Sequence, residues 1–84
     1  MNESLFTNAL RPRPDALFKS GTQNERLYRR LLEGPVTNAE IVHDLNILKY
    51  TGRLSDVRKA LQTHLMDVAK RPLGGGLWQY RLRG

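Results

Sequence analysis

The chain of 84 residues contains no cysteine, which excludes disulfide bonds and metal sites built on thiolates. No apolar run approaches the roughly 18 residues that cross a membrane. Residues 1–15 also lack the continuous apolar segment and the small-residue cleavage site of a signal peptide. We therefore expect a soluble, metal-free protein of the cytoplasm, with no membrane partner.

Groups that would support catalysis are missing as well. The only histidines are His43 and His64, and they lie on different predicted elements. No paired carboxylates and no nucleophile beside a base can be identified. The glycines at positions 74–76 are not followed by the Lys-Ser or Lys-Thr of a phosphate-binding loop. We expect no enzyme, no catalytic residue and no cofactor.

What the chain does have is positive charge, concentrated in its last third. The formal net charge is +6 and the isoelectric point is about 10.3. Residues 53–84 carry seven Arg or Lys against two Asp, a surplus of +5. Such a surplus favours a polyanionic partner. A membrane surface is disfavoured, because no segment joins a polybasic face to a large apolar one.

A first helix is predicted over residues 23–33. Ser20 or Thr22 can cap its start, and Gly34 with Pro35 ends it. Its apolar face consists of Leu27, Tyr28, Leu31 and Leu32. The spacing of these four residues predicts that the helix packs one side against a core.

Residues 36–61 predict two short helices joined by a tight turn. Thr37 and Glu40 form the capping box that starts the first of them. Asn46 ends it, because asparagine tolerates the left-handed backbone of a sharp turn. The apolar residues of this helix and turn that we expect to face the core are Ile41, Val42, Leu45, Ile47 and Leu48. This arrangement is a helix-turn-helix, which points to duplex DNA.

The second helix of the pair, residues 50–61, carries the donors that a major-groove helix needs. Leu54, Val57 and Leu61 face inward, which leaves polar and basic side chains on the remaining surface. Arginine can pair with a guanine edge, and hydroxyl side chains can read other edges or phosphates. The candidate DNA-contacting residues here are Lys49, Tyr50, Thr51, Arg53, Ser55, Arg58 and Lys59. A merely solvated basic face is the alternative, and the position of the charge on the second helix favours DNA contact.

Gly52 stands inside this second helix, where glycine costs about 1 kcal/mol relative to alanine. A close approach to the neighbouring helix or to a phosphate would compensate that cost. Of the two, we expect helix packing.

The last part of the chain predicts a β-hairpin. Strands are expected over residues 64–71 and 77–82, joined by a flexible tip at residues 72–76. Trp78, Tyr80 and Leu82 alternate with polar residues, which favours packing against the core over stacking on bases. The candidate DNA-contacting residues of this hairpin are Lys70, Arg71, Gly74, Gly75 and Arg81.

Residues 1–21 are interpreted as an extended N-terminal arm before a domain of residues 22–84. Arg11 and Arg13 lie between or beside prolines, as in basic segments that enter the minor groove, and a disordered tail is the alternative. Apolar residues of the arm could instead dock on a second protomer and make a homodimer. These residues are Leu5, Phe6, Leu17 and Phe18.

The predicted order is helix, helix, helix, hairpin, which is the order of a winged helix-turn-helix. The expected fold class is mainly α with a small β-hairpin: three helices followed by a two-stranded wing.

The stretch of residues 22–82 resembles a group of small helix-turn-helix proteins common in bacteriophages and prophages. The likeness rests on Thr22-Gln23 before the first helix and on Thr37 and Glu40 at the start of the second. It continues in Tyr80 of the final strand and in the third-helix sequence Arg53, Leu54, Ser55, Asp56, Val57, Arg58. The resemblance implies a winged helix-turn-helix that binds DNA. The chain departs from the family in having no glycine closely after the third helix and in its long arm.

Two functions follow from these expectations. The first is a double-stranded DNA-binding protein, a phage or prophage transcriptional regulator, with the third helix in the major groove and the wing on the backbone or in the minor groove. The second is a phage-encoded interaction protein that binds a host protein and inhibits or redirects it.

Overall fold

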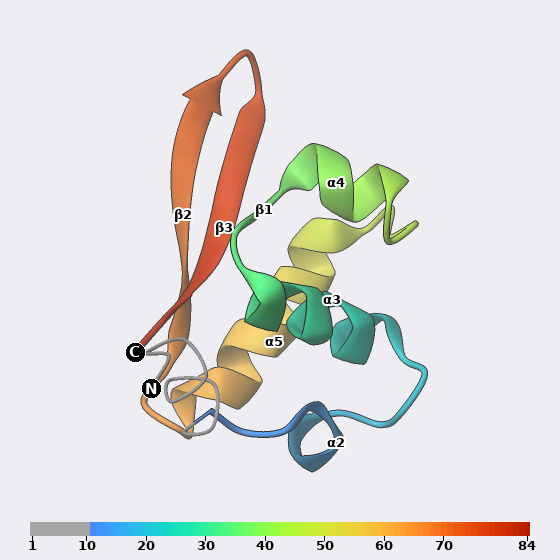
Figure 1. The fold of residues 1–84 in the computed structure, drawn as a ribbon, viewed down its shortest axis with the longest axis vertical. Coiled ribbons are helices and arrows are strands. Elements are labelled where there is room, and N and C mark those ends of the chain that lie inside the picture. The colour runs from blue at the N-terminus through green and yellow to red at the C-terminus, as the bar shows by residue number, and fades with distance from the viewer. Residues whose placement is uncertain (1–10) are drawn as a thin grey trace.

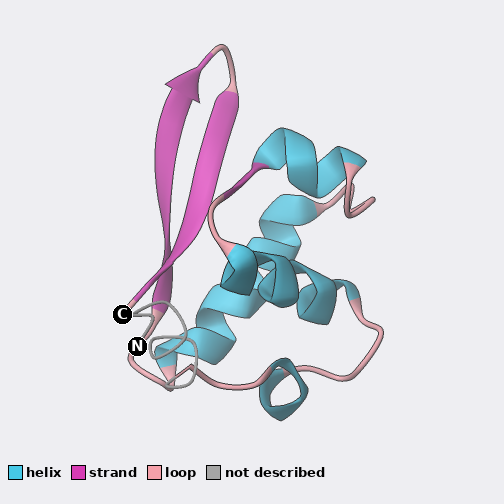
Figure 2. Cartoon of the chain, viewed as in Figure 1, coloured by secondary structure: helices cyan, strands magenta, loops and turns pink. Residues whose placement is uncertain are grey.

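The structure of the protein is a computed structural model that describes residues 11–84 (Figure 1). The elements in chain order are α2 (Pro14–Leu17), α3 (Gln23–Glu33), β1 (Val36–Thr37), α4 (Asn38–His43), α5 (Tyr50–Gln62), β2 (Asp67–Gly74) and β3 (Leu77–Arg83). Helices α3, α4 and α5 pack beside a long hairpin of β2 and β3, whose tip extends beyond α4 (Figures 1 and 2). Leu5 and Phe6, which we expected to dock on a second protomer, lie outside the described residues.

The predicted fold class, three helices followed by a two-stranded wing, is wrong. A short strand, β1, lies between α3 and α4 and pairs antiparallel with β3, through Val36 opposite Tyr80 and Thr37 opposite Gln79. The sheet is therefore three-stranded, in the order β1-β3-β2, and α2 adds a fourth helix. The protein is a small α/β structure with an antiparallel sheet. A strand of two residues is too short to show any alternation, so its sequence carried no signal.

Helix α3 has the predicted bounds, because its end signals are local. The Thr22 hydroxyl accepts a hydrogen bond from the Glu25 backbone N–H at 3.2 Å and so caps the first turn. Gly34 ends the helix with a φ of 138°, a conformation that favours glycine. Leu27, Tyr28 and Leu31 are fully buried or nearly so, as expected of the inward face.

The start of α4 and the backbone of the turn before α5 are predicted correctly, but α4 ends at His43 rather than at Asn46, and one side chain of the turn is misplaced. Both hydrogen bonds of the capping box between Thr37 and Glu40 are present. Asn46 has the left-handed backbone that we predicted, with a φ of 56°. Ile47 is fully buried, but Leu48 is 75% exposed, so the expectation that Leu48 faces the core is wrong. A single sharp turn can direct only one of two adjacent side chains inward.

The first strand of the hairpin is shifted by three residues toward the tip, and the tip is shorter than expected. The first strand begins at Asp67 rather than at residue 64, because residues 63–65 still form a turn after α5. Pairing continues past Pro72 through an irregularity to Gly74 opposite Leu77, so that only Gly75 and Gly76 form the turn. Both have positive φ, of 60° and 80°, which suits a tight connection between two twisted strands.

One hydrophobic core joins the helices to the base of the sheet. Its buried residues are Leu27, Tyr28, Leu31, Val36, Ile41, Ile47, Leu54, Val57, Leu61, Met66, Val68, Tyr80 and Leu82. Trp78 is partly buried and packs against this cluster, in line with the predicted preference for packing over base stacking.

Residues 11–21 lie against the helices, with α2 packed on α3. The Tyr28 hydroxyl donates a hydrogen bond to the Pro12 carbonyl at 2.6 Å, and the Phe18 ring meets Tyr28 edge-on at 5.9 Å between centroids. Leu17 and Phe18 pack against the core of their own chain. Their apolar surface is therefore already used within the protomer.

Candidate nucleic-acid interface

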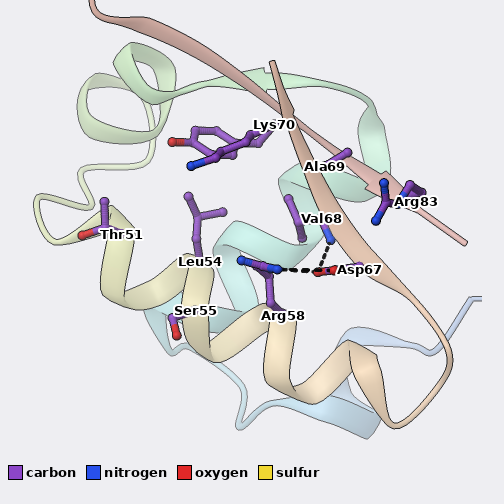
Figure 3. A pocket seen from close by; sticks show the side chains of 10 residues that line it. Thr51, Leu54, Ser55, Arg58, Asp67, Val68, Ala69, Lys70 and Arg83 are labelled. Atoms are coloured by element: carbon purple, nitrogen blue, oxygen red, sulfur yellow. Dashed lines mark hydrogen bonds and ion pairs between the residues drawn. The ribbon is translucent and has the colours of Figure 1, made fainter. Parts of the chain in front are cut away.

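A groove of about 390 Å³ runs between α5 and β2 (Figure 3). Its lining comes from three elements: Thr51, Leu54, Ser55 and Arg58 of α5, Asp67, Val68, Ala69 and Lys70 of β2, and Tyr80 and Arg83 of β3. Leu54, Val68 and Tyr80 belong to the buried core, whereas the exposed lining residues are Thr51, Ser55, Arg58, Lys70 and Arg83. The groove therefore combines an apolar floor with a polar, mostly cationic rim.

Arg58 spans this groove and binds Asp67 on the opposite side (Figure 3). Its Nε donates to Oδ1 of the carboxylate at 2.8 Å and its Nη2 donates to Oδ2 at 3.4 Å. These bonds, with one from the Val68 backbone N–H, hold the pKa of Asp67 below its ordinary value. Arg58, a predicted DNA contact, is thus also a link between α5 and the sheet.

Arg53 lies on a different side of α5 from the groove. Its Nη2 is 3.4 Å from an Asp56 carboxylate oxygen, and that oxygen also accepts a hydrogen bond from the Asn24 amide of α3 at 3.4 Å. Arg53 is half-buried, and its Nε atom is buried without a hydrogen-bond partner among the described residues. The structure therefore places Arg53 at the junction of α5 and α3 and separates it from the other predicted contacts of this helix.

The outward surface of α5 is a stripe of small and basic residues. Thr51, Gly52, Ser55 and Lys59 are all exposed, and their spacing of three and four residues keeps them on neighbouring positions of the helix surface. A Cβ atom added at Gly52 would meet nothing within 4 Å. Our expectation that Gly52 serves helix packing is therefore wrong, because nothing packs against it.

Lys49 and Tyr50 lie at the start of α5, and their surroundings differ. Lys49 is exposed at the N-cap position. Tyr50 is half-buried and meets Tyr80 edge-on, with 6.4 Å between ring centroids. Burial raises the pKa of Tyr80, and the neighbouring Tyr50 adds to that rise. Tyr50 therefore joins the start of α5 to the sheet as well as bordering the outward stripe.

The cations of the hairpin are divided between its two faces. Residues directly opposite each other in an antiparallel pair share a face, and Lys70 stands opposite the core residue Tyr80. Lys70 thus faces α5, with its ammonium 5.0 Å from the centroid of the Trp78 ring. Arg81 stands opposite Ala69 on the other face, where Arg71 also binds Gln79 across the strands at 3.3 Å. Gly74 and Gly75 lie at the exposed tip.

Asn38 ties the tip of the hairpin to α4, and sequence reasoning missed it. Its amide nitrogen donates to the Gly76 carbonyl at 3.1 Å, and its amide oxygen accepts from the Trp78 backbone N–H at 3.0 Å. Both partners lie about forty positions along the chain, at separations of 38 and 40 residues. No local pattern could have revealed this contact.

The predicted arm contacts occupy the segment around α2. Arg13 is exposed and pairs with Asp15 at 3.5 Å. Arg11 is half-buried and interacts electrostatically with Tyr28. The described part of the arm therefore places both arginines close to the helical body.

Comparison with protein-family models, with curated proteins and with solved structures finds no match to this chain. The resemblance to phage helix-turn-helix proteins therefore stays a prediction. Within residues 11–84, no helix has the length and apolar character needed to cross a membrane, and no three side chains of metal-binding type come together.

Proposed function

We propose that the protein binds duplex DNA, with α5 in the major groove and the β2–β3 hairpin beside the sugar-phosphate backbone. The observation that carries this proposal is that two surfaces rich in hydrogen-bond donors lie side by side. The exposed stripe of α5 lies next to a groove whose rim holds Arg58, Lys70 and Arg83. A helix fits the width of the major groove, and cations alongside it can meet the phosphates that border the groove.

The shape of the molecule supports the same arrangement. The hairpin extends beyond the helices along the longest axis of the molecule, which measures 37 Å (Figure 1). Asn38 fixes the tip of the hairpin relative to α4. A hairpin that is held in place can present Lys70 to DNA together with α5, without a large loss of conformational freedom on binding.

The overall charge supports a nucleic-acid partner over a neutral one. The net charge of +6 creates a field that attracts polyanions and speeds their encounter with the protein. Most of the surplus belongs to residues 53–84, which include nearly all of α5 and the whole hairpin. A role as a phage or prophage transcriptional regulator rests in addition on the resemblance of residues 22–82 to phage proteins.

The test is a titration of the purified protein into fluorescently labelled duplexes, followed by anisotropy. Random-sequence and phage-genomic duplexes are compared at several salt concentrations. We expect binding that falls steeply as salt rises, because phosphate contacts release counterions, with tighter binding to a subset of the genomic duplexes. No binding at about 50 mM salt, a condition that favours phosphate contacts, would overturn the proposal and lead to a search for a host-protein partner.

A further inference from the structure

Gly52 is unlike the other glycines of the described chain. Each of the others has a positive φ that favours glycine: Gly21, Gly34, Gly74, Gly75, Gly76 and Gly84. Gly52 lies within α5, in helical backbone that any residue can adopt. Its backbone conformation therefore does not require glycine.

The packing of the protein does not require glycine at this position either. Gly52 is exposed, and a Cβ atom built on it would have open space for 4 Å around it. Inside a helix, glycine is less stable than alanine, because it loses more backbone freedom on folding. Nothing within residues 11–84 compensates that loss.

The position of Gly52 shows where a compensating contact would come from. Ser55 lies about one helical turn away on the same surface and Lys59 about two turns away, and Thr51 stands beside Gly52. Gly52 is thus a bare stretch of backbone near the N-terminal end of the stripe that faces outward. A molecule lying on this stripe could approach the α5 backbone more closely here than at any neighbouring position with a side chain.

We propose that Gly52 is the point at which a DNA duplex comes nearest to the backbone of α5. This inference rests on the proposed DNA binding and adds a positioning residue to it. A helix in the major groove sits at a depth set by the side chains between its axis and the base edges. The missing Cβ at Gly52 lets α5 lie deeper, so that Thr51, Ser55 and Lys59 reach their partners together.

The test substitutes Gly52→Ala and Gly52→Leu and measures thermal unfolding and duplex affinity side by side. Gly52→Ala should raise the Tm by no more than roughly 4–8 °C, since alanine is the better helix former and Gly52 lies in the first turn of α5. The same variant should weaken duplex binding about tenfold, as a misfit methyl group does at a close-packed contact. Gly52→Leu should weaken binding further while remaining folded. Ala16→Leu, which places the same leucine side chain on an exposed residue of α2, should leave binding unchanged.

Each outcome has a definite meaning. A more stable Gly52→Ala variant with lost affinity supports the proposal, because a structural role would not move the two readouts in opposite directions. Wild-type affinity in Gly52→Ala would overturn the inference and leave the DNA-binding proposal intact. A lowered Tm would also overturn it, because the fold itself would then need the glycine. If the wild-type chain binds no duplex at low salt, the proposed function is overturned, and the inference about Gly52 falls with it.

Discussion

Individual cations of the candidate interface differ in the contacts that the fold gives them. Arg58 is held by two hydrogen bonds to Asp67, and Arg53 pairs with Asp56. Lys59 and Lys70 have no ion-pair partner among residues 11–84, although Lys70 lies over the Trp78 ring. A phosphate can approach these two lysines without displacing a carboxylate. We therefore expect the lysines to contribute more to phosphate binding than the two arginines.

Replacing Lys70 with Gln should weaken binding to every duplex by a similar factor. One phosphate contact is lost, so the slope of log affinity against log salt should become shallower by about 1. The measurement is anisotropy over a salt series with the wild-type and variant proteins. Lys19→Gln is the matched control, because Lys19 is an exposed lysine in the connection between α2 and α3. An equal change in slope for both variants would show that only total charge matters.

The ion pair between Arg58 and Asp67 predicts a pH dependence of stability. The folded state lowers the pKa of Asp67 below its ordinary value of 3.8, mainly through hydrogen bonds from Arg58. A lowered pKa means that the carboxylate stabilises the fold above that ordinary value, and that this stabilisation is lost as pH falls through the folded-state pKa. The Tm difference between wild type and Asp67→Asn should be largest at neutral pH and shrink in acid. Thermal melts from pH 7 to about pH 2.5 would check this, and a difference that stays constant with pH would contradict it.

Among the elements, α4 and the hairpin are held together by the side chain of Asn38 in addition to the pairing of β1 with β3. Asn38 makes two hydrogen bonds to the tip of the hairpin, one on each side of Leu77. Asn38 is also the first residue of α4, directly after the capping residue Thr37, so the capping of this helix and the placement of the hairpin occur at adjacent residues. The orientation of the hairpin toward α5 is therefore set partly by α4.

Asn38→Ala should destabilise the protein by about 1–2 kcal/mol, since two hydrogen bonds between elements are lost. The change should also shift the fluorescence of Trp78, which is the only tryptophan and whose backbone N–H is one of the two partners. Chemical unfolding and emission spectra measure the two effects. Gln23→Ala is the control, because Gln23 is the exposed first residue of α3. Equal effects of the two substitutions would show that Asn38 acts only within its helix.

The elements that the sequence predicted well are those with local end signals. Thr22 and Gly34 bound α3, and Thr37 with Glu40 starts α4, because each signal acts within one turn of the helix. Strand β1 had no such signal. Its two residues become a strand only because β3, more than forty positions later, lies beside them. The error in fold class came from this long-range pairing and from the additional helix α2.

At the scale of the whole molecule, the boundary between core and surface passes between two adjacent residues. Ile47 is fully buried in the core, and Leu48 is exposed to solvent. Ile47→Ala should cost about 2–5 kcal/mol of unfolding free energy, because it leaves a cavity in a packed core. Leu48→Ala should change the free energy by less than about 0.5 kcal/mol, since Leu48 is 75% exposed. Denaturant unfolding of both variants gives the comparison. Similar losses in both would mean that Leu48 is buried in solution.

The candidate site was predictable as a set of residue types and less so as an arrangement. Helical spacing predicted a broad set of polar and basic residues on the outer surface of α5, and of these Thr51, Ser55 and Lys59 share one exposed surface in the structure. The same spacing could not show that Asn24 of α3 holds the partner of Arg53. The groove itself could not be predicted from the sequence, because its two sides belong to α5 and to the hairpin, which only the packing of the core brings together.

The sequence by itself determined where α3 and α5 begin and end, where α4 begins, which residues form most of their apolar faces, and that the last third of the chain is basic. These properties depend on residues within a few positions of one another. The tertiary structure alone decided that β1 joins the sheet, that Asn38 holds the hairpin and that Arg58 binds Asp67 across the groove. Each of these contacts joins different elements, so its partners are chosen by packing in three dimensions rather than by spacing along the chain.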